Sequence, residues 1–169
     1  MRKLTISIAT ILIAMALLGC GFFTSIFPTA VPEPSPLPSP LPTNPAQQLP
    51  LLNGDWHIDF TQSGGIAGTS RSLEISSSGE MTFTNTRTGE KHVTQLPAEK
   101  LAALTDLVAA ASFRPASQPS GCADCFIFDL QLASGGEKFE TQLDQVNLPD
   151  SGLQSLIEFL AQLLDSAAK

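Results

Sequence analysis

Residues 56–61 read Trp-His-Ile-Asp-Phe-Thr, so large apolar side chains alternate with polar ones. This period of two is typical of a strand with one buried face and one exposed face. The same alternation recurs at Leu73 and Ile75, and again at Met81 and Phe83. The folded part of the chain therefore begins with at least three half-buried strands.

Glycine-containing turns separate these strands. Gly79 follows the second strand, and Gly89 precedes a further short strand expected at 92–95. Residues 126–132 and 139–143 alternate in the same way, with a Gly-Gly pair at 135–136 between them. These signals predict a second strand pair joined by a tight turn.

The period changes to that of a helix in two places. Pro97 can occupy the first helical position and Glu99 the first turn. The apolar face of this helix consists of Leu101, Leu104, Val108 and Ala111, and a loop is expected at 113–119. A second helix begins with a predicted Ser151–Gln154 capping box, and its apolar face consists of Leu153, Leu156, Ile157, Leu160 and Leu164.

The order of elements is three or four strands, a helix, two strands and a helix. One-sided strands beside amphipathic helices favour an antiparallel sheet with both helices packed on one face. We therefore predict a two-layer α+β domain over residues 53–169, with the order βββ(β)-α-ββ-α.

The N-terminus has the pattern of an export signal. Basic residues at 2 and 3 precede an uncharged, mostly apolar run at 4–18, which is too short to span a membrane as a helix. The run ends in Leu-Leu-Gly-Cys and resembles the lipobox of bacterial lipoproteins. The resemblance implies that residues 1–19 are a cleaved signal peptide and that Cys20 carries lipid. An uncleaved anchor or an ordinary secretory signal is the alternative.

Residues 20–52 are predicted to be a tether that begins with the lipidated cysteine. Nine of the 13 prolines lie in this segment, which favours an extended polyproline II conformation. At about 3.1 Å per residue, it could lift the domain on the order of 100 Å from a membrane. A proline-rich recognition site is the alternative. The expected location is extracytoplasmic, with the lipid in the cell membrane or outer membrane.

Charge argues against nucleic acid as a partner. The chain has 9 basic and 16 acidic residues, and loss of the signal would make the excess of acidic residues larger. An acidic surface without a basic patch repels phosphate backbones. The membrane contact is therefore expected to be made through the lipid alone.

Cys122 and Cys125 remain as a pair if Cys20 is lipidated. A disulfide is expected because oxidising compartments outside the cytoplasm allow one. Zinc binding needs about four ligands, and the sequence has no second C-x-x-C or paired histidines. A redox motif is the remaining alternative, although such motifs usually lie at a helix N-terminus.

No catalytic constellation is found. His57 and His92 are not in metal-ligand spacing, and there is no phosphate-binding or nucleophile motif. Asp55 and Asp59 would lie about 13 Å apart on one strand face, too far for a glycosidase pair. We therefore expect no enzyme activity, no metal and no cofactor.

Residues 63–68 read Ser-Gly-Gly-Ile-Ala-Gly and join the first two strands. Glycine allows positive φ and close backbone approach, and three glycines exceed what a tight turn needs. One alternative is a hairpin in which Ile66 folds back onto the sheet. A phosphate cradle is less favoured, because neither a helix start nor a lysine follows.

The chain resembles emfourin, a protein inhibitor of thermolysin-like metallopeptidases, over most of residues 55–165. The resemblance rests on Ile58, Phe60, the 63–68 run, the helix at 101–108, Phe113, Asp124, Phe126, Phe128, Leu130 and the helix at 153–164. The lipobox, the tether and the cysteine pair depart from that family, whose members are usually short.

The resemblance implies a surface-tethered inhibitor that occludes the cleft of a secreted metallopeptidase. Such enzymes accept a bulky apolar residue in their S1′ pocket, and Ile66 would fill it. The implied contact residues are Ser63, Gly64, Gly65, Ile66, Ala67 and Gly68. The alternatives are a non-inhibitory envelope domain, which binds a protein or supports surface structure, and a redox protein.

Overall fold

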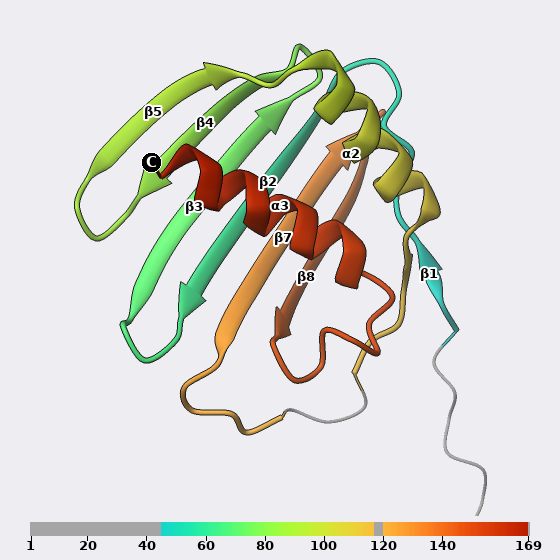
Figure 1. Cartoon of the computed structure of the whole chain (residues 1–169). Coiled ribbons are helices and arrows are strands. Elements are labelled where there is room, and N and C mark those ends of the chain that lie inside the picture. The colour runs from blue at the N-terminus through green and yellow to red at the C-terminus, as the bar shows by residue number, and fades with distance from the viewer. Residues whose placement is uncertain (1–44, 117–119, 169) are drawn as a thin grey trace, which may run out of the picture. The chain divides into compact units, whose positions relative to one another are not determined.

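A six-stranded antiparallel sheet forms one layer of the domain (Figure 1). The computed structural model describes residues 45–116 and 120–168. The strands follow the spatial order β5-β4-β3-β2-β7-β8. Their bounds are Trp56–Gly64 (β2), Thr69–Ser76 (β3), Glu80–Asn85 (β4), Glu90–Gln95 (β5), Phe126–Ser134 (β7) and Glu137–Asp144 (β8).

Two helices, α2 (Ala98–Ala110) and α3 (Gln154–Ala167), form the second layer on one face of the sheet (Figure 1). The predicted two-layer α+β fold is confirmed, as is the order of its main elements. Neither helix of the described ranges has the length and hydropathy that a membrane crossing requires.

β2 lies at the centre of the sheet and carries the middle of the core. Ile58 is opposite Ile75 of β3 and Leu132 of β7 in the strand register. One step along, Phe60 is opposite both Leu73 and Leu130. The predicted period of two therefore directs one side of each strand against the helices, and all six side chains are buried.

The folded unit begins earlier than Asn53. A short strand β1 (Gln47–Gln48) pairs with β6 (Ser112–Phe113), so the segment expected to be the end of the tether is part of the fold. Leu49 and Leu52 are buried because their side chains join the core. Phe113, expected in a loop, is buried and meets Phe139 edge-on at 5.3 Å between ring centroids.

The rest of the predicted N-terminal organisation is outside the described residues. This applies to the signal peptide at 1–19, to lipidated Cys20 and to the tether up to residue 44.

The predicted capping box at the start of α3 is wrong. The N-cap is Leu153, and no side chain caps the helix. The hydroxyl of Ser151 donates to the carbonyl of Leu148 (2.7 Å) and accepts from the N–H of Leu153 (3.0 Å). Gln154 instead donates to Glu158 (2.8 Å). Ser151 is buried, so its hydroxyl closes the preceding turn rather than the helix.

Because the domain starts before residue 53, two nearby leucines, Leu49 and Leu51, should differ in how much they contribute to its stability. Leu49 is 5% exposed and Leu51 is 59% exposed. We expect Leu49→Ala to lower the free energy of unfolding by about 2–4 kcal/mol, because it leaves a cavity. Leu51→Ala is the matched control and should change it by about 0.5 kcal/mol or less. Urea denaturation of the full chain measures both, and equal effects would place residue 49 outside the core.

Candidate functional site

The β2–β3 hairpin ends in a turn formed by residues 65–68. Ser63 and Gly64, also predicted to contact a partner, are the last residues of β2. Ile66 is 94% exposed, so its side chain projects from the tip instead of folding back onto the sheet. An isoleucine so exposed at a loop tip is available to enter a pocket of another molecule.

Two of the glycines are required by the fold itself. Gly64 has φ +88°, and a Cβ placed on it would lie 2.5 Å from the carbonyl oxygen of Cys125. Gly65 has φ +69°, and its Cβ would meet the ring of Phe126 at 2.8 Å. Only glycine lets the hairpin end pass so close to the start of β7. Gly68 (φ +58°) faces open space.

Backbone and side-chain hydrogen bonds hold the tip from both sides. On the β7 side, the N–H of Gly65 donates to the carbonyl of Cys125 (3.1 Å). On the other side, the guanidinium of Arg87, in the β4–β5 turn, donates to the carbonyl of Ala67 (3.1 Å). Within the turn, the N–H of Gly68 donates to the carbonyl of Gly65 (2.9 Å). The tip is therefore preorganised by its neighbours.

A further contact ties the hairpin to the helical layer. Arg71 of β3 donates to the side chain of Gln62 on β2 (2.9 Å) and forms an ion pair with Asp165 of α3 (2.9 Å). Gln62 is buried, so this pair lies beneath the hairpin on the helix-covered side. The base of the tip is thus fixed to both layers of the domain.

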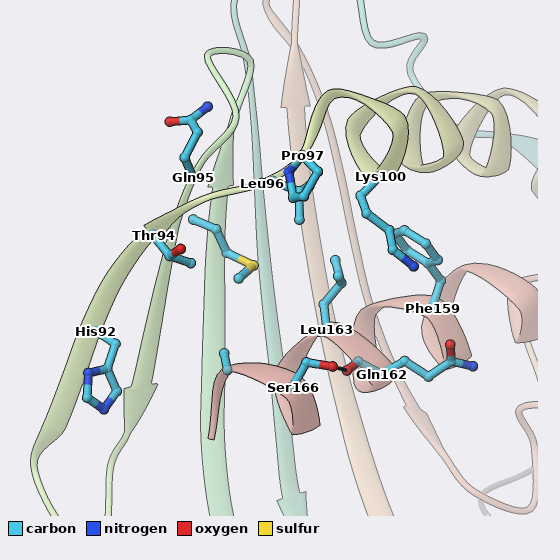
Figure 2. Close-up of a pocket in the computed structure, with 12 residues that line it drawn as sticks. His92, Thr94, Gln95, Leu96, Pro97, Lys100, Phe159, Gln162, Leu163 and Ser166 are labelled. Atoms are coloured by element: carbon cyan, nitrogen blue, oxygen red, sulfur yellow. Dashed lines mark hydrogen bonds between the residues drawn. The ribbon is translucent and has the colours of Figure 1, made fainter. Parts of the chain in front are cut away.

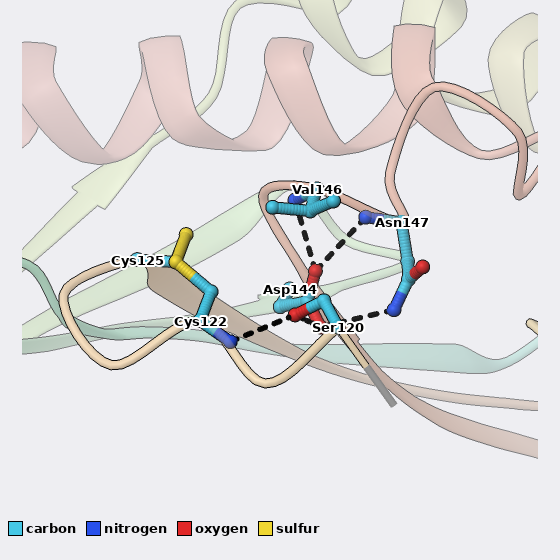
Figure 3. Close-up of a disulfide and its surroundings, with 6 residues drawn as sticks. All are labelled: Ser120, Cys122, Cys125, Asp144, Val146 and Asn147. Atoms are coloured by element: carbon cyan, nitrogen blue, oxygen red, sulfur yellow. Dashed lines mark hydrogen bonds between the residues drawn. A yellow bond between two sulfur atoms is a disulfide. The ribbon is translucent and has the colours of Figure 1, made fainter. Parts of the chain in front are cut away.

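The turn beside the tip carries the cysteine pair (Figure 3). Cys122 and Cys125 form a disulfide, with their Cα atoms 5.7 Å apart. The pair precedes strand β7 and not a helix, unlike the usual redox arrangement. The disulfide closes the small turn at 122–125. The carbonyl of Cys125 in this turn accepts the hydrogen bond from Gly65, so the closed turn holds the hairpin tip.

Asp144, at the end of β8, organises the two loops next to this turn (Figure 3). Its carboxylate accepts hydrogen bonds from the hydroxyl of Ser120 (2.6 Å), the N–H of Val146 (2.9 Å) and both the N–H (2.9 Å) and the side-chain amide (3.0 Å) of Asn147. The Ser120 hydroxyl also accepts from the N–H of Cys122 (3.3 Å). The bond from Ser120 is the main reason that the pKa of Asp144 lies below its ordinary value. The bonds from Asn147 and Val146 add to this, and burial opposes it.

Each of the two histidines contacts an acidic residue two positions away on its own strand. His57 contacts Asp59 at 3.0 Å on the open face of the sheet, and Asp55 precedes β2. His92 contacts Glu90 at 2.9 Å. Within residues 45–116 and 120–168, no three histidine, cysteine or acidic side chains are grouped as metal ligands.

Sequence reasoning missed a groove of about 530 Å³ on the helix-covered side of β5 (Figure 2). Its walls come from β5, the start of α2 and the end of α3, which are separated by up to 75 positions in the chain. The sequence of β5, Glu-Lys-His-Val-Thr-Gln, lacks the apolar alternation of the central strands, and this is the one local signal that the strand lies at an edge of the sheet.

No family model matches this chain, and no curated protein matches it either. The fold itself is a two-layer α+β domain whose β2–β3 hairpin ends in an exposed isoleucine, Ile66.

The contact between Gly64 and Cys125 predicts unequal sensitivity of the glycines. Gly64→Ala should lower the free energy of unfolding by about 2 kcal/mol or more, because it combines positive φ with overlap against a backbone carbonyl. Gly68→Ala meets no neighbour and should cost only about 1 kcal/mol. Thermal unfolding of the full chain measures the difference. Equal losses would show that β7 does not press on the hairpin.

The hydrogen bonds to Asp144 predict a pH effect. Its folded pKa is lowered, so its contribution to stability is complete above the unfolded value of about 3.9 and is lost as pH falls through the folded value. Asp144→Asn should therefore unfold more readily at neutral pH, and the gap from wild type should narrow below about pH 4. Exposed Asp150→Asn is the control. A gap that stays constant in urea titrations from neutral to acidic pH would contradict the assignment.

Proposed function

We propose that this chain is a membrane-tethered, extracytoplasmic inhibitor of secreted thermolysin-like metallopeptidases. The observation that carries the proposal is the 94% exposure of Ile66 at the tip of a hairpin that is held on both sides. The identity of the target class comes from the resemblance to emfourin. The lipid on Cys20 and the proline-rich tether belong to the same proposal.

The mechanism is occlusion of the enzyme's cleft. Residues 65–68 are narrow and lack large side chains apart from Ile66, so the tip can enter a cleft that accepts an extended substrate. The isoleucine then fills the apolar S1′ pocket, while the small neighbours let the enzyme approach the backbone closely. The inhibitor needs no metal or cofactor of its own for this mode of action.

Preorganisation is the source of affinity in this mechanism. A flexible loop loses conformational freedom when it binds, and this loss subtracts from the binding free energy. Here the hydrogen bonds from Gly65 and to Ala67 fix the tip before any partner arrives. A single anchor residue on such a scaffold can supply much of the binding free energy.

The test compares two exposed aliphatic side chains at opposite ends of the sheet. The full chain in detergent should slow casein cleavage by thermolysin at stoichiometric amounts. Ile66→Asp should weaken inhibition about 30-fold or more, the loss expected for an anchor worth about 2 kcal/mol. Leu51→Asp, which also replaces an exposed aliphatic residue, should inhibit as wild type does.

Two results would contradict the proposal. Wild-type protein that leaves thermolysin-like enzymes fully active at excess would reject the function. Equal inhibition by wild type and Ile66→Asp would reject the hairpin tip as the contact. Unfolding curves of both variants confirm that any loss does not come from misfolding.

A further inference from the structure

A small pocket beside the hairpin tip is lined by two arginines, and none of its described lining residues is acidic. It lies where β3 begins and β4 ends, next to the β4–β5 turn, at the same end of the sheet as the tip (Figure 1). Its volume of about 180 Å³ suits a small anion better than a larger organic ligand. Its lining residues are Thr69, Ser70, Arg71, Asn85, Arg87 and Thr88.

Arg71 of β3 lines the pocket with part of its guanidinium group already engaged. Its Nη2 atom donates to Gln62 and pairs with Asp165, both at 2.9 Å. These two contacts fix the side chain, which is only 20% exposed. Its Nε–H is buried and has no hydrogen-bond partner in the part of the chain that the structure describes. Because a buried N–H without a partner costs free energy, this group favours any acceptor that can reach it.

Arg87 brings the second guanidinium group, from the β4–β5 turn. Its Nη1 atom donates to the carbonyl of Ala67 in the hairpin tip (3.1 Å). Within residues 45–116 and 120–168, no carboxylate forms an ion pair with it. The planar, forked group carries further N–H donors, and their geometry matches the oxygens of an oxyanion. Arg87 is therefore both a wall of the pocket and a brace of the tip.

Two neutral side chains add donors to the same pocket. The Oδ1 atom of Asn85 accepts from the N–H groups of Arg87 (3.1 Å) and Thr88 (3.3 Å), so its NH₂ group is the end left to donate to a ligand. The hydroxyl of Thr88 accepts from the N–H of Glu90 (3.4 Å) and keeps its own hydrogen to donate. Donors from β3, from the end of β4 and from the following turn thus meet at one pocket.

The carboxylates next to this pocket are engaged elsewhere. Glu90 is opposite Asn85 in the strand register, but its carboxylate contacts His92 at 2.9 Å. Asp165 contacts Nη2 of Arg71, and its side chain is 64% exposed. The chain as a whole has 16 acidic residues against 9 basic ones. The pocket is therefore a local reversal of the acidic character of the chain.

We propose that this pocket binds a tetrahedral oxyanion of the size of phosphate. Guanidinium groups and oxyanions form charge-assisted hydrogen bonds, which are stronger than neutral ones. Arg71 and Arg87 supply the charge, while Asn85 and Thr88 supply neutral donors. A carboxylate group has fewer oxygens to meet donors that come from several segments, so it fits less well. The bound anion also fixes Arg87 and, through it, the carbonyl of Ala67 at the tip.

Inorganic phosphate is the probe for this site, with sodium chloride at equal ionic strength as the reference. The melting temperature of the full chain in detergent should rise and then saturate with phosphate concentration, since a ligand of the folded state alone stabilises that state. Sodium acetate should bind at least tenfold more weakly. Hydrogen exchange should slow at the amides of residues 85–88 and 66–68 when phosphate is bound.

Two matched pairs of variants locate the bound anion. Asn85→Asp keeps the oxygen that accepts from the turn but places a carboxylate in the pocket, so it should weaken phosphate binding at least tenfold. Asn53→Asp makes the same change at an exposed residue before β2, at the other end of the sheet, and should bind as wild type does. Arg87→Gln should also weaken binding at least tenfold, while exposed Arg114→Gln should not. Melting temperatures without phosphate confirm that each variant is folded.

Three outcomes would overturn the proposal. The first is a rise in melting temperature that does not saturate and is equal in wild type and all variants, which is the general effect of a kosmotropic salt. The second is equal binding of phosphate and acetate. The third is full phosphate binding by Asn85→Asp or by Arg87→Gln. No enzyme is present in this test, so its failure is distinguishable from failure of the proposed inhibition.

Discussion

The close passage of β2 against the start of β7 fixes the geometry of the sheet at its hairpin end. At Gly64 the backbone of the central strand leaves no room for a side chain beneath the carbonyl of Cys125. The next residue donates a hydrogen bond to that same carbonyl. This contact sets the point at which the hairpin leaves the sheet, and it therefore determines how far Ile66 projects. The disulfide turn, the Asp144 loop and the Arg87 turn all lie at this end of the sheet.

The fold class could be predicted from the sequence because apolar and polar side chains alternate regularly along the two central strands, β2 and β3. Ile58 and Phe60 on β2 predicted the buried face, and the 3.6-residue period of Leu104 and Val108 predicted α2. The parts that failed depend on contacts between distant segments. The proline-rich sequence predicts that Leu49 ends a tether. In the structure β1, which directly precedes Leu49, pairs with β6, 60 or more positions away, and Leu49 packs in the core. Ser151 fits a local capping pattern, but it is buried in the turn before α3, where its hydroxyl donates to the carbonyl of Leu148.

The three glycines at 63–68 identify the candidate site in the sequence, but they do not predict the contacts that hold it in place. The sequence predicts that the glycines allow a partner to approach the backbone, whereas the structure shows that Gly64 and Gly65 are already required by the approach of β7. The exposed part of the tip is therefore shorter than the six-residue run and consists of Ile66, Ala67 and Gly68. No local pattern could indicate the braces from Arg87 and Cys125, because they come from turns about 20 and 60 positions away. The β5 groove escaped prediction for the same reason.

Competition at the active site of thermolysin distinguishes occlusion of the substrate cleft from binding elsewhere on the enzyme. If the hairpin tip occupies the substrate cleft of a thermolysin-like enzyme, as we propose, the full chain and a small, zinc-binding active-site inhibitor should exclude each other when both are titrated onto immobilised thermolysin. Full displacement of the chain by saturating small inhibitor is the predicted result. A ternary complex of enzyme, chain and small inhibitor, or the absence of any binding by the chain, would show that the hairpin tip does not occupy the cleft.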